Sequence, residues 1–321
     1  MLKRVSRFLL PAIALGLVCC ENVHAQIAYG VNAAGTLFTF DTDAPANVTT
    51  IGPVTSGGGT IIPEAIDFRP GTSTLYAIDV GANTTQLYTI NIGTGAATPV
   101  GAGFPSSGAG YSLSPNDSIG FDFNPTTLQG DGSMRIRLVA TNNTNLRLNS
   151  STGLISNTDT ALAFGSGASP FVDGAAYINN VVGSTSTTLY DMDSRNDDLL
   201  IQNPPNAGTV TTVGPFGVTI DASRGIGFDI FTTLGSTDNT IGGDFGFAVL
   251  KRPDAPINGP LGAYLLYDVN LATGQLTNGA LVGPAATPFD FEGGFAVLPV
   301  PEPATVLLAL VGAAGLWVRR W

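Results

Sequence analysis

The apolar residues of this chain occur in short runs that are separated by Gly, Pro, Asn and Asp. The pattern is clearest in residues 64–101, with runs at 65–68, 75–78, 86–90 and 97–101. Such runs, rich in aromatic and β-branched residues and bounded by turn residues, are typical of short antiparallel strands. No window has apolar residues at helical spacing over three turns, so long helices are not expected. The segment is therefore predicted to form four strands, a to d.

Variants of this four-stranded unit recur along the chain. Strand a reappears at residues 120–125, 175–177 and 227–230, each time followed by further strand-like runs. A leucine marks strand c in every copy, at Leu37, Leu87, Leu146, Leu199 and Leu265. The spacings of 50, 59, 53 and 66 residues exceed the roughly 40 to 50 residues of common propeller blades, which leaves room for insertions. A function specific to this chain is expected in the long insertions, at residues 103–116, 235–243 and 252–262.

The first copy lacks strand a, since residues 27–31, 36–40 and 48–52 match strands b, c and d. Residues 289–291, which include Asp290, resemble the missing strand. Pairing the C-terminal strand with the N-terminal sheet would leave no exposed edge. The fold class is therefore predicted to be all-β: a β-propeller-like circular array of four-stranded antiparallel blades, five in number, closed by its N- and C-terminal strands. Six blades, if residues 103–116 or 295–299 contain another sheet, and a two-sheet sandwich or barrel are the alternatives.

Residues 1–25 have the pattern of a secretory signal peptide. A basic start is followed by a short apolar core, and small residues precede the expected cleavage between Ala25 and Gln26. Cleavage at a lipoprotein box around Cys20 is a weaker alternative, because such boxes usually have a small residue before the modified Cys.

Removal of this segment changes the available chemistry. Cys19, Cys20 and His24 are the only cysteines and the only histidine of the chain. The mature protein would then contain no thiol or imidazole, which excludes Ser-His-Asp and Cys-His catalysis and zinc, iron or copper sites that use these ligands. A non-enzymatic protein without disulfide bonds is expected.

The C-terminal residues 300–321 contain Pro301, Glu302 and Pro303, then an apolar run from 304 to 318, then Arg319 and Arg320. This order resembles the PEP-CTERM sorting signal of exported proteins of Gram-negative bacteria. The resemblance implies processing by signal peptidase and an exosortase, transient anchoring in the inner membrane through the tail, and a final location at the cell surface or in the extracellular matrix. The two arginines would stay on the cytoplasmic side.

The exported body, residues 26–299, is strongly acidic. The whole chain has 13 Lys and Arg against 24 Asp and Glu, and five basic and two acidic residues lie outside the body. The remaining 8 basic and 22 acidic residues give a net charge of about −14. No basic patch could follow a phosphate backbone, so nucleic acid is not an expected partner.

The body also resembles a family of exported bacterial domains of undefined function. The resemblance rests on residues 66–70, on Leu75 and Tyr76, on residues 87–90, and on Thr-Gly turns after strand c. It implies a propeller-like fold and no particular activity.

Four aspartates, Asp67, Asp122, Asp229 and Asp290, fall at matching places in strand a. They could form a ring of carboxylates that binds a cation in the central channel. The favoured interpretation is structural, because residues repeated in every blade usually stabilise the blade. Each carboxylate would then accept hydrogen bonds from nearby turn amides of the connection between strands a and b.

The densest acidic segment, residues 191–198, is a weak candidate for calcium, through Asp191, Asp193, Asp197 and Asp198. Arg195 stands where a calcium loop has Asp or Asn, so a solvated hairpin is favoured. No other cofactor is expected. Phe104 and Tyr111, in a glycine-rich loop, are candidates for an exposed contact.

Two functions fit these features. The first is a non-enzymatic surface or matrix protein that binds an extracellular polysaccharide or another surface protein. The second is a hydrolase of extracellular polysaccharides that uses only carboxylates or calcium, since two suitably spaced carboxylates suffice for glycoside hydrolysis.

Overall fold

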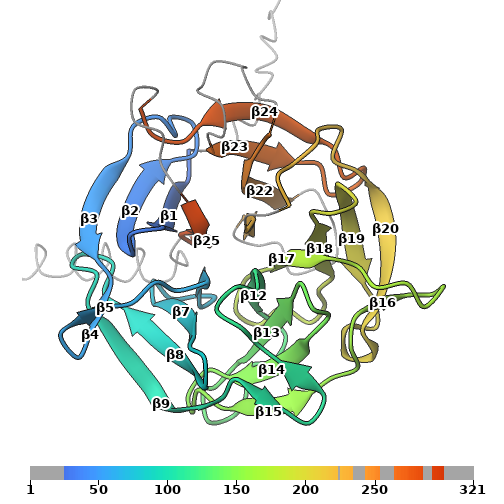
Figure 1. The fold of residues 1–321 in the computed structure, drawn as a ribbon. Helices are drawn as coiled ribbons and strands as arrows, with labels where there is room; N and C mark the ends of the chain where they lie inside the picture. The colour runs from blue at the N-terminus through green and yellow to red at the C-terminus, as the bar shows by residue number, and fades with distance from the viewer. Residues whose placement is uncertain (1–24, 223–224, 234–242, 254–263, 285–290, 300–321) are drawn as a thin grey trace, which may run out of the picture.

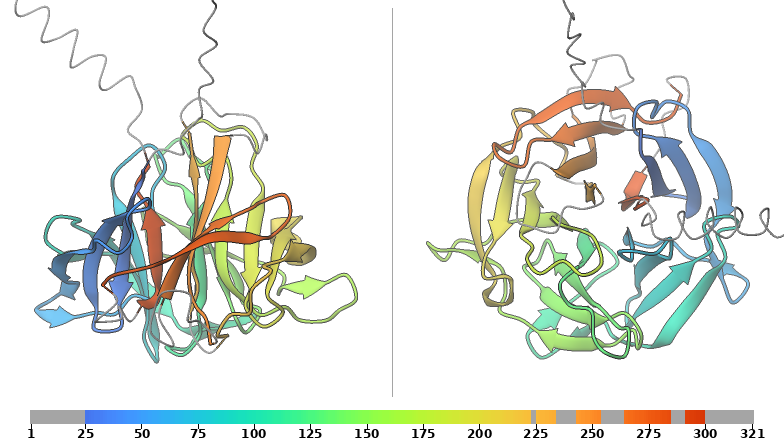
Figure 2. Two further views of the ribbon diagram at one scale, coloured as in Figure 1. Left: turned by 90° about the horizontal axis from the view of Figure 1, so that it is seen from above. Right: turned by 180° about the vertical axis from the view of Figure 1, so that it is seen from behind.

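Five antiparallel sheets stand side by side in a closed ring around a central channel (Figure 1). The computed structural model describes residues 25–222, 225–233, 243–253, 264–284 and 291–299. Viewed from the side, the innermost strands run along the ring axis (Figure 2). The chain is an all-β propeller of five blades, as its repeats predict.

Each blade has four strands, which follow one another from the channel outward. Blade 1 is β25 (Phe291–Val297), β1 (Ile27–Asn32), β2 (Thr36–Asp41) and β3 (Thr49–Pro53). Blade 2 is β6 (Ala65–Phe68), β7 (Leu75–Val80), β8 (Thr84–Ile90) and β9 (Ala97–Pro105). Blade 3 is β12 (Ile119–Phe123), β13 (Arg135–Ala140), β14 (Asn145–Asn149) and β15 (Ile155–Thr158). Blade 4 is β17 (Val172–Tyr177), β18 (Leu189–Asp193), β19 (Asp198–Gln202) and β20 (Thr209–Pro215). Blade 5 is β21 (Gly227–Thr232), β22 (Asp244–Lys251), β23 (Tyr264–Val269) and β24 (Leu276–Leu281).

The remaining elements are small additions to this ring. Two short hairpins lie in the connections between blades: β4 (Thr55–Ser56) with β5 (Gly59–Thr60), and β10 (Ser107–Gly108) with β11 (Tyr111–Ser112). β16 (Ala163–Phe164) pairs with β20 in parallel, and a 3₁₀ turn, η1, spans Pro205–Ala207. Neither residues 103–116 nor residues 295–299 form a sixth blade, because the first stretch holds a hairpin and the second contributes to β25.

The ring is closed by the pairing of β25 with β1, in which Tyr29 lies opposite Ala296. This confirms that the C-terminal strand completes the N-terminal sheet. The strand differs in detail from the prediction, because β25 begins at Phe291 and Asp290 lies outside the described residues. Tyr29 corresponds to Tyr76 in blade 2 and to Tyr190 in blade 4, which lie opposite Asp67 and Ala176. Ala296, opposite Tyr29, therefore holds the place that was expected for Asp290.

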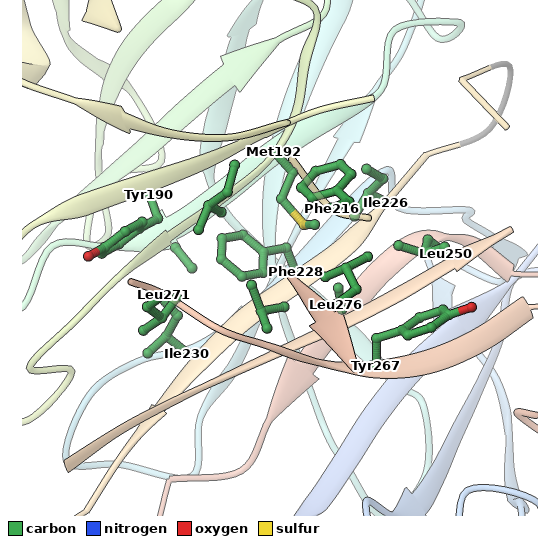
Figure 3. Packing of buried hydrophobic residues seen from close by; sticks show 14 of the residues in the cluster. Tyr190, Met192, Phe216, Ile226, Phe228, Ile230, Leu250, Tyr267, Leu271 and Leu276 are labelled. Carbon is green, nitrogen blue, oxygen red and sulfur yellow. The ribbon is translucent and has the colours of Figure 1, made fainter. Parts of the chain in front are cut away.

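The hydrophobic core lies between neighbouring blades. The cluster between blades 4 and 5 is shown in Figure 3, where Met192 of β18 packs beside Phe228 of β21. Similar clusters fill the other spaces between blades. Phe104 belongs to the cluster of blades 2 and 3 and is 4% exposed, so it is not the surface contact that its glycine-rich surroundings suggested. Tyr111 lies half-buried against the same cluster, and its hydroxyl donates a hydrogen bond to the Pro105 carbonyl at 2.9 Å.

The innermost strands approach one another closely at a few small residues. A Cβ atom on Gly120 would lie 2.8 Å from the backbone nitrogen of Ala175 in the next blade and 2.7 Å from Cγ2 of Val139. Both distances are shorter than real contacts, so the backbone of β12 or β17 would have to move.

We expect Gly120→Ala to lower the free energy of unfolding by about 1 to 3 kcal/mol, the usual cost of overpacking a dense core. The matched control is Gly130→Ala, because a Cβ there meets no atom within 4 Å. Urea denaturation of both variants would test this expectation, and equal midpoints would contradict the close contact between blades 3 and 4.

Candidate functional site

A cavity of about 670 Å³ opens at one end of the central channel. All five blades contribute to it from the beginnings of their innermost strands. We call it the channel mouth; these contributing residues are Glu64, Ile119, Asp173, Ile226 and Phe291. The end of β7 adds residues 79–80, and the segments that precede blades 2 and 3 add residues 60–62 and 115–118.

Four carboxylates line the channel mouth. Glu64 accepts a hydrogen bond from the Val80 backbone N–H at 2.7 Å. Asp117 accepts bonds from the Ser114 backbone N–H at 2.8 Å and from Nδ2 of Asn142 at 2.9 Å. Asp79 is half-buried and Asp173 is fully buried, and burial raises the pKa of both, well above the ordinary value for Asp173. The described lining contains no Lys, Arg, His or Cys. The mouth therefore presents hydrogen-bond acceptors and negative charge beside the apolar Ile61, Ile62, Ile226 and Phe291.

Sequence reasoning singled out none of the four carboxylates, although the insertion at 103–116, where a specific function was expected, contributes Pro115 and Asn116 to the lining. The lining of the mouth comes from six separate segments, and only the ring brings them together. A usable signal existed, because Glu64 directly precedes strand a and Asp79 ends strand b, and a propeller places both positions at the same end of the blade.

Deeper in the channel, Asp67, Asp122 and Asp229 occupy the same level of blades 2, 3 and 5. Their partners in the second strands are Tyr76, Arg137 and Phe247. Ala176 in blade 4 and Ala296 in blade 1 take the corresponding places. The three carboxylates meet, with one oxygen from each lying within 4.8 Å of the others. They are only 1 to 3% exposed and do not line the channel mouth.

The hydrogen bonds of these aspartates differ from the turn contacts that we expected. Each carboxylate accepts from a backbone N–H of the next innermost strand: Asp67 from Phe123 at 2.8 Å, Asp122 from Tyr177, and Asp229 from Val297 at 2.6 Å. Asp67 and Asp229 also accept from the N–H of the residue that follows them, Phe68 and Ile230.

One N–H group from each of the five blades therefore donates to this carboxylate ring. Asp122 cannot accept from the residue that follows it, because the Phe123 N–H already donates to Asp67. Its Oδ1 atom is buried and has no hydrogen-bond partner among the described residues.

Burial and mutual repulsion both disfavour ionisation of the ring. Burial is the main cause that raises the pKa of Asp67 and Asp122 well above the usual range, and repulsion from neighbouring carboxylates adds to it. The pKa of Asp229 is raised to about 6 by burial, against the effect of its two backbone hydrogen bonds.

The acidic segment 191–198 is less solvated than the sequence suggests. Asp191 and Asp193 are fully buried, while Asp197 and Asp198 are half-buried. Asp193 accepts bonds from the backbone N–H groups of Arg195 and Asn196, both at 3.1 Å, and Asp197 accepts from the Ile220 N–H at 3.0 Å. The structure does not bring these four carboxylates together as a metal-ligating group.

A buried polar network, also unforeseen, joins blades 3 and 4. Arg137 is 2% exposed and donates to Asn145 at 2.6 Å, Asp159 at 2.7 Å and Asn206 at 2.9 Å. Asp191 lies near this guanidinium, which lowers its pKa, but burial dominates and raises the value to about 8.

The two ends of the exported body differ in what the structure describes. Gln26 is 7% exposed, and its N–H donates to Oγ1 of Thr42 at 3.0 Å, so the body is anchored from the residue that follows Ala25. Pro301, Glu302, Pro303, Arg319 and Arg320 lie outside the described residues. No helix in the described part of the chain is long and apolar enough to cross a membrane.

Residues 36–291 match the family model described as "Domain of unknown function (DUF4394)". The chain belongs to this family. No curated protein matches the sequence of this DUF4394 member.

The solved structures that this chain resembles are distant in sequence. A candidate exo-β-1,3-galactanase from Bifidobacterium bifidum s17 is 13% identical, with a TM-score of 0.46 over 78% of this chain and 87% of the other. AofleA from Arthrobotrys oligospora is 14% identical, with a TM-score of 0.43 over 86% and 72%. A luciferin-regenerating enzyme is 10% identical, with a TM-score of 0.37 over 80% and 76%. The function must therefore be inferred from this chain's own residues.

We expect Asp191→Asn to flatten part of the pH dependence of stability. Folded Asp191 titrates near pH 8, whereas an unfolded Asp titrates near pH 3.9, so the folded protein holds a proton that the unfolded chain has released. The wild type should therefore lose stability relative to the variant as pH rises from 5 to 8, by at most about 4 kcal/mol.

Urea denaturation at several pH values would measure this difference. The exposed Asp43, at the opposite end of the blades, supplies the control Asp43→Asn, which makes the same chemical change at the surface. A curve for Asp191→Asn that runs parallel to that of the wild type would show that Asp191 is ionised in the folded protein.

Proposed function

We propose that this chain is an exported cell-surface or extracellular-matrix protein with a non-enzymatic binding role, and that the channel mouth is its binding site. The observation that carries the proposal is the acidic cavity of about 670 Å³ to which all five blades contribute. A site built from five rigid strand ends is held in place before a ligand arrives, which reduces the entropic cost of binding.

The chemistry of the mouth favours a neutral or cationic polysaccharide as the ligand. Carboxylates accept hydrogen bonds from sugar hydroxyls or ammonium groups, and apolar walls can pack against sugar rings. An anionic polymer would be repelled by the ionised carboxylates of the mouth and by the net charge of the body, about −14.

A polysaccharide hydrolase is the second candidate, because the mouth holds several carboxylates in one cavity. Two of its carboxylates are already engaged, Glu64 by one backbone N–H and Asp117 by two donors. These bonds favour the ionised forms, but burial outweighs them at Asp117 and raises its pKa, as it does at Asp79 and Asp173. Hydrolysis would require one of these groups to transfer a proton, whereas binding requires none to do so, and binding is therefore the function proposed first.

We expect purified residues 26–299, which contain every described strand, to be retained on neutral or cationic polysaccharides and not on anionic ones. Asp79→Asn should weaken this binding about 2- to 10-fold, the usual effect of losing one hydrogen bond. Asp43→Asn, at the other end of the blades, should bind like the wild type. Affinity chromatography on a panel of immobilised polysaccharides, with a reducing-end assay on the eluate, measures both retention and cleavage.

Absence of retention on every polysaccharide would contradict the binding role. Release of reducing ends that Asp79→Asn abolishes would instead establish the hydrolase.

The sorting proposal has its own test. Deletion of Pro301 to Trp321 should leave export intact and shift the protein from the surface fraction to the medium or periplasm, because the tail is the element that an exosortase would recognise. Fractionation of cells that express the full and the truncated chain would show the shift. An unchanged distribution would count against the PEP-CTERM assignment.

A further inference from the structure

The carboxyl groups of Asp67, Asp122 and Asp229, the carboxylate ring, are both buried and close together, a combination that makes their ionised forms unfavourable. The three groups are 1 to 3% exposed, and one oxygen from each lies within 4.8 Å of the others. Isolated buried charges are very unfavourable unless a counter-charge or a proton compensates them. None of the three carboxylates forms an ion pair with a Lys or Arg among the described residues, and Arg137, which lies opposite Asp122 in the strand pairing, is paired with Asp159 instead.

A second observation points to a missing partner at the same place. The Phe123 N–H donates to Oδ2 of Asp67, and the Ile230 and Val297 N–H groups donate to the two oxygens of Asp229. Oδ1 of Asp122, in contrast, is buried and lacks a hydrogen-bond partner among the described residues, and it belongs to a carboxylate that faces the other two. Buried polar atoms in native proteins nearly always have a partner, so this atom indicates an additional group.

The spacing suits a single metal ion. Ca²⁺ binds oxygen at about 2.3 to 2.6 Å, so two oxygens on the same ion are at most about 5 Å apart. The separation of the three oxygens, within 4.8 Å, falls inside this limit. An oxygen that accepts one N–H keeps a second lone pair, so Asp67 and Asp229 can bind a metal without losing their backbone bonds.

We propose that Asp67, Asp122 and Asp229 together bind one hard divalent cation inside the central channel, with Ca²⁺ as the best-fitting ion. Carboxylate ligands without imidazole or thiolate select calcium, magnesium or manganese over zinc and copper. Calcium tolerates irregular geometry, whereas magnesium requires a near-ideal octahedron and usually keeps several waters. The ion would neutralise the ring and would join β6, β12 and β21, three strands that are far apart in the sequence.

This site is separate from the proposed polysaccharide site, because none of the three aspartates lines the channel mouth. A protein could therefore bind the ion and fail to bind any polysaccharide, or the reverse.

The test uses purified residues 26–299 after dialysis against a chelator. We expect elemental analysis of the protein before dialysis, or titration after it, to give one divalent ion per chain. Ca²⁺ at about 100 times its dissociation constant should raise the thermal midpoint by about 5 °C or more, and chelator should reverse the rise. Terbium, a luminescent substitute for calcium, should be sensitised by Tyr76, which pairs with Asp67, and displaced by Ca²⁺.

Asp122→Asn is the decisive variant, because it keeps an acceptor for the Tyr177 N–H and removes charge from the unpartnered oxygen. It should weaken ion binding at least about 10-fold, as expected for the loss of one charged ligand. The matched control is the double variant Asp197→Asn with Asp198→Asn in the acidic hairpin, which should bind like the wild type. If Asp122→Asn does not fold, competition between terbium and Ca²⁺ on the wild type still tests the site.

A response to Mg²⁺ or Mn²⁺ that Asp122→Asn abolishes would also support the site. Absence of bound metal and of any response to Ca²⁺, Mg²⁺, Mn²⁺ or terbium would overturn it and would leave shared protons as the partner of the three carboxylates. Binding that survives Asp122→Asn and is lost in the hairpin variant would overturn it as well.

Discussion

The inner edges of the five blades impose the constraint on which this structure depends. Each innermost strand pairs with one neighbour and leaves its other edge facing a narrow channel, where backbone N–H groups have no strand partner. A buried N–H without an acceptor costs about 1 to 3 kcal/mol. In this ring, three aspartates accept bonds from one such N–H of every blade, and thereby connect each of blades 2, 3 and 5 to the blade that follows it.

The same side chains create an electrostatic difficulty. Acceptors strong enough to satisfy the inner edge carry charge, and three of them meet in a space of low dielectric constant. The raised pKa values of Asp67 and Asp122 express that difficulty. Stability of the blades and affinity for a counter-ion are thus consequences of one arrangement, and a structural role for the ring does not exclude a metal at its centre.

The blades and their number could be predicted from the sequence because the relevant signals are local. Apolar runs, turn residues and the leucine of each strand c are recognised from the few residues around them. The missing strand a of the first copy then indicated that the ends of the chain would pair. The register of that pairing was harder to predict from the sequence. Residues 289–291 carry the Phe-Asp motif, yet Ala296 lies opposite Tyr29, because packing against blades 2 and 5 selects the register and a motif of three residues does not.

Features that depend on two blades could not be read from the sequence. The backbone donors of the aspartates belong to neighbouring blades, and the buried position of Arg137 follows from acceptors on Asn145, Asp159 and Asn206, two of which lie outside strands. Asp191 was correctly noticed as part of an acidic segment, but its burial follows from its place in β18 between two blades. The channel mouth also depends on several blades, because its carboxylates come from blades 2 and 4 and from the connection between blades 2 and 3.

The order of the aspartates around the ring accounts for the oxygen that lacks a partner. Blades 2 and 3 are the adjacent pair that both carry an aspartate, whereas Ala176 and Ala296 take the corresponding places in blades 4 and 1. Asp229 therefore accepts the N–H of Ile230 in its own strand and the N–H of Val297 in the next blade. Asp122 lacks the first of these donors, because the Phe123 N–H that follows it donates to Asp67 in the preceding blade. The unpartnered Oδ1 of Asp122 is the consequence of having an aspartate in two consecutive blades.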